Sequence, residues 1–152
     1  MRPCPYGFPQ VILNHPLLPE PMPTLFWLSC PFLVAEVSRL ESAGAVQRYE
    51  ALLAQDHELA QEYRRAHEEY KKERLSLLAQ AELELVREKG FSSLLEAGIA
   101  GLTNPWRVKC LHAQLAHFLV RGKNPIGERV AAELPALFCP PERILCRIEE
   151  KL

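Results

Sequence analysis

The sequence has no long apolar run and no excess of charge of one sign. Its most hydrophobic stretch, Leu25 to Val37, contains a serine, a proline and a glutamate, and it is too short to span a bilayer. The 18 basic and 19 acidic side chains give a formal net charge of -1, which provides no attraction for a nucleic-acid backbone. We therefore expect no membrane span and no nucleic-acid partner.

Secretion signals and standard ligand motifs are also missing. The opening MRPCPYGFPQ lacks the apolar segment of a secretory signal, which predicts a cytoplasmic protein. Five cysteines, an odd number, fit a disulfide framework poorly in that compartment. There is no C-x-x-C pair, and the glycines match neither a P-loop nor a dinucleotide fingerprint. The thiols are therefore expected to be free, bound to a metal or reactive.

The chain length of 152 residues predicts a single domain with its own core. We divide it into a proline-rich β-ribbon (1–30), a helical core (31–134) and a C-terminal tail (135–152). Most prolines lie in the first part and exclude helix there. Two runs between them, Gln10–Asn14 and Thr24–Ser29, are rich in large apolar residues and predict a pair of antiparallel strands. Two strands alone are marginal, so they must lie on helices.

Helical spacing and capping residues predict a predominantly α-helical α+β fold, with about five helices behind the ribbon and one of them long. The long segment, Asp56–Lys89, either projects beyond the core or bends at Lys71–Arg74, where its apolar spacing breaks. The tail after Cys139 fits a helix or a strand, and helix is favoured. The segments with helical spacing are Pro31–Ala43, Val46–Gln55, Asp56–Lys89, Ser93–Ala97 with a capping box, Asn104–Gly122, and Asn124 to about Leu134.

The segment Asn104–Gly122 predicts a metal site. Cys110 and His117 are about two helical turns apart, so a helix would point both the same way. Cys30 ends the second strand and Cys4 precedes the first, and a ribbon laid on this helix would bring all four together. Thiolate and imidazole are preferred zinc ligands, and thiolates also hold iron. The alternative is that these are small buried thiols and a core imidazole.

The start of the same segment suggests an anion site. Asn104 is a good N-cap and is followed by proline, which suits the first helical position. Arg107 and Lys109 would lie in the first turn, where cations are unfavourable unless an anion offsets them. A helix N-terminus can bind phosphate or carboxylate, which would suit an enzyme or sensor for a phosphorylated small molecule. The alternative is a pair of solvated side chains.

Two further histidines are polar candidates. His67 lies between Tyr63 and Tyr70 with glutamates beside it, so it could serve as an acid–base group or pack at the edge of the core. His112 would lie well round the helix from the Cys110 row. The long helix over residues 57–89 carries many opposite charges four residues apart. It could serve as a surface for a homodimer or another protein partner.

Several segments together resemble a known bacterial family. They are CPYGFPQVI, PTLFWLSCPFLVAEVSRLE, ELAQEYRRAHEEY, RVKCLHAQLAH and GKNPIG. As a set they resemble the family called domain of unknown function 501, over most of residues 4–130. Some members of that family have cysteine where Tyr6 stands here. The resemblance implies a bacterial cytosolic protein and specifies no activity. The leading interpretation is a regulatory or binding domain with a Cys/His metal cluster.

Overall fold

The structure is a computed structural model that describes residues 2–147. Within that range it has seven α-helices and a three-stranded antiparallel sheet, so the predicted helix-dominated α+β class is confirmed. The strands are β1 (Arg2–Pro3), β2 (Pro9–Leu13) and β3 (Phe26–Leu28). The helices are α1 (Pro31–Ser42), α2 (Ala45–Gln55), α3 (His57–Ser76), α4 (Gln80–Lys89), α5 (Ser92–Glu96), the 3₁₀ turn η1 (Ile99–Gly101), α6 (Leu111–Arg121) and α7 (Pro125–Glu133). Among the described residues, no helix combines the length and apolar character needed to cross a membrane.

The predicted strand pair is confirmed within a residue or two. β2 and β3 are antiparallel, with Val11 opposite Leu28 and Ile12 opposite Trp27. Alternate side chains point to opposite faces: Val11 and Phe26 are buried, whereas Ile12 and Trp27 remain exposed. The short β1, which the sequence analysis did not predict, pairs with the other edge of β2. The sheet therefore gives one face to the core.

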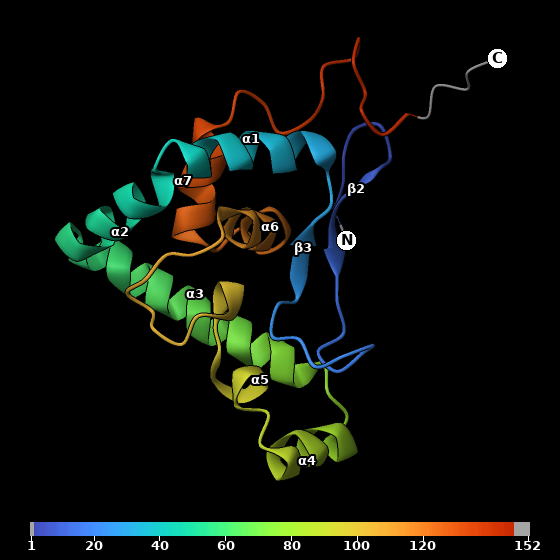
Figure 1. The fold of residues 1–152 in the computed structure, drawn as a ribbon, viewed down its shortest axis with the longest axis vertical. Helices are drawn as coiled ribbons and strands as arrows, with labels where there is room; N and C mark the ends of the chain where they lie inside the picture. The colour runs from blue at the N-terminus through green and yellow to red at the C-terminus, as the bar shows by residue number, and fades with distance from the viewer. Residues whose placement is uncertain (1, 148–152) are drawn as a thin grey trace.

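Helix α6 lies at the centre of the molecule, seen almost end-on in Figure 1. α7, α1, β3 and η1 all pack against it, and its residues Leu111, Leu115 and Leu119 are buried in the main hydrophobic core. The approach of α7 is close enough to require glycine. A Cβ atom on Gly127 would lie 2.3 Å from the Gln114 carbonyl oxygen. This close contact therefore fixes how α7 sits against α6 at Gly127.

The start of α6 differs from the prediction, because the helix begins at Leu111 and not near Asn104. In a longer helix the Leu111 N–H would donate to the Arg107 carbonyl, four residues earlier. Instead, the Leu111 N–H donates to the Glu41 carboxylate at 2.7 Å, and the Arg107 carbonyl accepts from the Tyr63 hydroxyl at 3.2 Å. Both halves of the expected helical bond are satisfied by other elements. Residues 102–110 therefore form turns and extended chain.

The long helical segment is interrupted after Ser76, two residues beyond the expected bend, and resumes at Gln80 as α4. Leu78 turns inward at the break and packs with Val86 and Leu94 in a second, smaller apolar cluster. The Ala79 N–H donates to the Glu82 carboxylate at 2.8 Å, which starts the new helix. The use of residues 57–89 as a partner surface stays a prediction.

The tail shows the second clear difference. Residues 134–147 contain turns without helix or strand, so the favoured helix is wrong for that part, and its continuation over Ile148–Leu152 lies outside the described residues. The ribbon binds the tail backbone: the Tyr6 hydroxyl donates to the Cys139 carbonyl and the Gln10 amide donates to the Leu137 carbonyl. The short helix α5 is confirmed, but its N-cap is Phe91, without a side-chain cap.

Candidate metal centre at the start of helix α6

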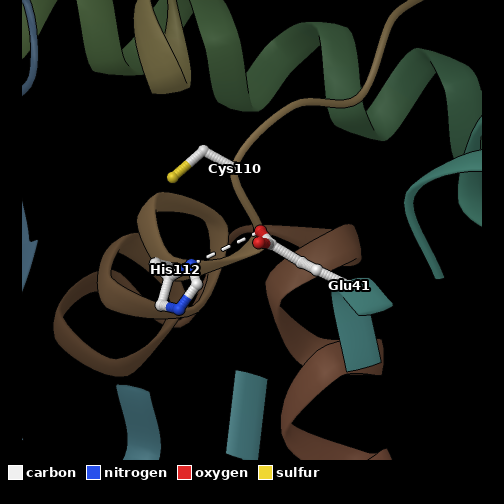
Figure 2. A group of neighbouring side chains, drawn as sticks. All are labelled: Glu41, Cys110 and His112. Atoms are coloured by element: carbon white, nitrogen blue, oxygen red, sulfur yellow. Dashed lines mark ion pairs between the residues drawn. The ribbon is translucent and has the colours of Figure 1, made fainter. Parts of the chain in front are cut away.

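Three side chains that commonly bind metals meet where the chain enters α6. Glu41 comes from the last turn of α1, Cys110 is the N-cap of α6, and His112 lies in its first turn. One oxygen, one sulfur and one nitrogen from these residues all lie within 4.8 Å of one another. Figure 2 shows the three side chains around the point where the loop becomes helix. Within residues 2–147, no other group of three such side chains brings its ligand atoms this close together.

Cys110 has an unusual backbone conformation for this position. Its φ is +49°, in the left-handed region that residues other than glycine seldom adopt. The neighbouring bonds hold it there: its carbonyl accepts from the Ala113 N–H at 3.0 Å, and the next residue is anchored to Glu41. Strained backbone of this kind persists where the surroundings determine it, and it is enriched at functional sites. The Cys110 residue is exposed to solvent.

The His112 ring is oriented by α1. Its Nε2 lies 3.2 Å from the Val34 carbonyl oxygen and 3.1 Å from the Ser38 hydroxyl. A carbonyl oxygen can only accept, so Nε2 carries the hydrogen. Nδ1 lies 3.3 Å from the Glu41 carboxylate, which is also an acceptor, so Nδ1 has to lose its proton before it can bind a metal. A hydrogen bond on the far nitrogen is the usual way in which proteins orient a metal-binding histidine.

The electrostatics of the group favour a charged thiolate. The pKa of Cys110 is lowered, mainly by a hydrogen bond with His112 and further by the Ala113 backbone N–H, against an opposing effect of burial. The pKa of His112 is raised, mainly by the same bond with Cys110 and also by the charge of Glu41. Metal binding requires a deprotonated thiol. The lowered pKa therefore makes the Cys110 thiol easier to deprotonate than an ordinary cysteine.

Among the described residues, no three of the four predicted metal ligands form a close group. Cys110 belongs to the group at the start of α6, whereas Cys30 is the buried N-cap of α1 and Cys4 precedes the turn into β2. His117 is 3% exposed and stacks on Phe26 with ring centres 5.9 Å apart. Burial lowers the pKa of His117 to about 4. Because the helix starts after Cys110, the seven-residue spacing does not place Cys110 and His117 on one helical face.

The predicted anion-binding residues lie before the helix. The Asn104 side chain accepts from the Trp106 N–H at 3.0 Å and forms a local turn. Arg107 forms an ion pair with Glu50 at 2.6 Å, and Lys109 is exposed. The true N-terminus of α6 faces a carboxylate of the protein itself, Glu41, as expected for the positive end of a helix. Phosphate binding at residues 104–109 stays a prediction.

His67 lies inside the protein, on α3. Its Nδ1 accepts from the Ile99 N–H at 3.0 Å, and its ring meets Tyr63 edge-on. Within the described residues, its Nε2 has no hydrogen-bond partner. Burial, followed by the charge of His117, lowers the pKa of His67 to about 4. Glu68 forms an ion pair with Lys71 at 2.7 Å, and among residues 2–147 no carboxylate binds His67 Nε2.

Two members of the group at the start of α6 could have been predicted from the sequence, and the third could not. Cys110 and His112 are two residues apart, but the expectation that His112 points away from Cys110 assumed a helix through both. That expectation is wrong because Cys110 has non-helical backbone angles. Glu41 lies 69 residues before Cys110 along the chain. No local motif links them, and only the packing of α1 against α6 brings them together.

The fold and this site define a helix-dominated α+β domain with an exposed Cys–His–Glu group at the start of its central helix. The chain belongs to the family described as "Protein of unknown function (DUF501)", whose sequence model matches residues 1–132. The resemblance found in the sequence is thereby confirmed. The match includes Glu41, Cys110 and His112 and ends before the tail. Neither the curated proteins nor the solved structures contain a significant match.

Proposed function

We propose that this protein is a metal-binding domain that holds a zinc-type ion between Glu41, Cys110 and His112. The observation that supports the proposal is the approach of three different ligand atoms to within 4.8 Å of one another, from two helices distant in sequence. Sulfur, imidazole nitrogen and carboxylate oxygen are all established zinc ligands, with bond lengths of about 2.0–2.3 Å. A thiolate and a carboxylate also supply two negative charges to balance a divalent ion.

The number of ligands supports an open site. Structural zinc is normally held by four protein ligands, whereas sites with three leave a position for water or another molecule. Cys110 is exposed, so a small molecule can reach the group from solvent. The Val34 carbonyl holds the Nε2 side of His112, and the Leu111 N–H binds the Glu41 oxygen that faces Nδ1, so the second carboxylate oxygen is the one available to an ion. The proposed role is therefore binding or sensing through an exchangeable position on the ion.

The test is a titration of the reduced, metal-free full chain with cobalt(II) and zinc(II). Cobalt bound through Cys110 gives a thiolate charge-transfer band, and zinc displaces it. His112→Gln and Glu41→Gln should each weaken binding at this site by at least about 10- to 100-fold, which is the loss caused by removing a group that only supports a ligand. Cys110→Ser should remove the band that is sensitive to His112→Gln. The exposed His57 provides the matched control, His57→Gln, which should bind as the wild type does.

The proposal fails if none of the three substitutions changes cobalt or zinc affinity. It also fails if the wild type binds no cobalt at concentrations where ordinary zinc sites fill. Circular dichroism and thermal melting of each variant would separate loss of a ligand from loss of the fold. Glu41→Gln needs this control most, because Glu41 also accepts the Leu111 N–H.

A second candidate function is thiol chemistry at Cys110, which is exposed at the N-terminus of α6 beside His112 and whose thiol pKa is lowered. The thiolate is the nucleophilic form, and helix N-termini and neighbouring imidazoles are known to activate it. The rate of Cys110 alkylation at neutral pH should exceed that of Cys4 and should fall in His112→Gln. Bound zinc should protect Cys110 from alkylation. Equal rates for the two thiols would contradict this candidate.

A further inference from the structure

Three separate parts of the chain meet at the ribbon end of the molecule, and each brings cysteine. Cys4 opens a tight turn, in which its N–H donates to the Phe8 carbonyl at 2.8 Å and its carbonyl accepts from the Gly7 N–H at 3.0 Å. Tyr6, inside that turn, donates its hydroxyl to the Cys139 carbonyl at 2.9 Å. The Tyr6 ring also meets Phe138 edge-on, with ring centres 6.4 Å apart. The tail at Cys139 is thus held against the turn at Cys4.

The next part of the tail lies on the start of α1. Pro140, Arg143 and Leu145 line one groove together with Phe32 and neighbouring residues of α1. In Figure 1 the tail passes along α1 at the edge of the molecule. Cys30 directly precedes α1, and Cys146 directly follows Leu145. The backbone therefore brings the tail thiol to the end of α1 at which Cys30 lies.

The thiols at this end of the molecule differ in burial. Cys30 and Cys139 are 4% and 5% exposed, while Cys4 and Cys146 are intermediate. Four of the five cysteines share this region, and the fifth is Cys110.

We propose that Cys4, Cys30, Cys139 and Cys146 form a second metal site, a tetrathiolate that binds a thiophilic divalent ion such as zinc and fastens the tail to the sheet and to α1. Four cysteines from separate segments are a common structural zinc set. On binding, the four thiols release four protons to solvent, four sulfur–metal bonds form, and the thiolates with the ion carry a net charge of 2-. Arg39, Arg143 and Glu36 line the adjacent groove, and Arg39 pairs with Glu36, so these three side chains carry one net positive charge.

Binding would draw the sulfurs closer together. Among the described residues, no three of these thiols lie within 4.8 Å of one another, while zinc–sulfur bonds are about 2.3 Å long. The part that must adjust is the tail, which is joined internally by turns such as Arg143 N–H to the Pro140 carbonyl. A segment without helix or strand can shift without breaking a helical or sheet ladder. The expected result of binding is a more ordered tail.

This tetrathiolate shares no residue with the group at the start of α6, so the two proposals succeed or fail separately. The experiment uses the full chain, reduced and stripped of metal, and titrates it with zinc and with cobalt alone. We expect two ions per chain. The pair of substitutions Cys139→Ser and Cys146→Ser should remove one ion and leave the His112-dependent ion, whereas His112→Gln should remove the other. Cys110→Ser is the matched cysteine control and should leave the tetrathiolate intact.

Hydrogen exchange provides a readout that does not depend on counting ions. Zinc should slow exchange over residues 134–147 by at least tenfold in the wild type and in His112→Gln, and should have no effect there in Cys146→Ser. Because Cys146 is only partly buried, in a segment without helix or strand, this single variant should retain the fold and keeps the test usable if the double variant does not. Unchanged zinc binding in both tail variants would overturn the proposal. Disulfides among these cysteines, with no zinc uptake after reduction, would overturn it too.

Discussion

The two histidines of α6 lie five residues apart and have opposite environments. His112 is partly exposed beside Glu41 and Cys110, and its pKa is raised. His117 is buried between aromatic rings, and its pKa is lowered to about 4. Burial disfavours the charged imidazole, while an acidic neighbour favours it. Histidine is thus suited to chemistry in the first turn of α6 and to packing in the middle of the helix.

The interior region extends beyond His117 as a chain of bonded polar groups. The Asn124 amide donates to the Gln114 side-chain oxygen at 2.8 Å, and the Gln114 amide donates to the Tyr63 hydroxyl at 2.8 Å. Asn124 also caps α7 by accepting from the backbone N–H groups of its first turn. These groups use their hydrogen-bonding capacity on one another. We therefore expect these interior polar residues to control stability, and the residues at the start of α6 to control binding.

The largest expected effect concerns Arg74, the most deeply buried charge. Its guanidinium donates to the Leu94 carbonyl at 2.8 Å, to the Pro23 carbonyl at 3.0 Å and to the Ala97 carbonyl. Arg74→Met should destabilise the protein by about 3–5 kcal/mol, because three carbonyls lose their donors. Urea unfolding would measure it.

The matched control for Arg74→Met is the exposed Arg64 on the same helix. Arg64→Met should change the free energy of unfolding by less than about 0.5 kcal/mol. A similar small effect at Arg74 would show that its buried position contributes little. That result would contradict the expectation that the buried polar residues control stability more than those at the start of α6.

The second effect is the pH dependence of stability from His67 and His117. Both have a folded-state pKa of about 4, against about 6.5 in an unfolded chain. Between these values the unfolded state binds more protons, so stability is complete above about pH 6.5 and falls as the pH drops towards 4. The loss from pH 7 to 4.5 should be on the order of 2 kcal/mol for each histidine.

Chemical denaturation at several pH values would measure this loss, with two variants for comparison. His117→Gln should remove roughly half of the pH dependence, because one of the two buried imidazoles no longer titrates. His57→Gln, at an exposed position, should retain all of it. If His117→Gln and wild type showed the same slope between pH 7 and 5, His117 would not be a buried neutral imidazole.

The smallest expected effect on stability is at His112, at the start of α6. In the metal-free protein, His112→Gln should change the free energy of unfolding by less than about 1 kcal/mol, as partly exposed polar contacts usually do. At a zinc concentration about 100 times the dissociation constant, the ion should stabilise the wild type by about 2.7 kcal/mol through this site, and the variant should lose that gain. A large metal-free loss would place His112 with the structural histidines. Thermal melting with and without zinc measures both quantities.

Much of the fold could be predicted because its determinants are local. Proline-bounded apolar runs specified the ribbon, and cap residues such as Asp56 and Asn124 located the starts of α3 and α7, where each side chain accepts from its own first turn. The break at Leu78 was harder to place. The break depends on the packing of Leu78 against Val86 and Leu94. These contacts are too far apart in the sequence to appear as a helical spacing of apolar residues.

Only part of the candidate site could be predicted from the sequence. Cys110 was identified as a ligand candidate, but its partner was expected to be His117 because a helix was assumed through both. Glu41 did not enter the hypothesis. Its carboxylate accepts the first free N–H of α6 and also faces His112. The contacts of Glu41 therefore both shorten the helix and complete the Glu–Cys–His group.

By itself, the sequence determined the helix-dominated α+β class, the antiparallel ribbon and most helix starts, since capping and periodicity depend on residues a few positions apart. Tertiary structure decided where α6 begins and which histidine faces the thiol. Those features depend on whether Leu111 and Arg107 bond to each other or to Glu41 and Tyr63. The competing partners are about 40 to 70 residues away, and only packing brings them within reach.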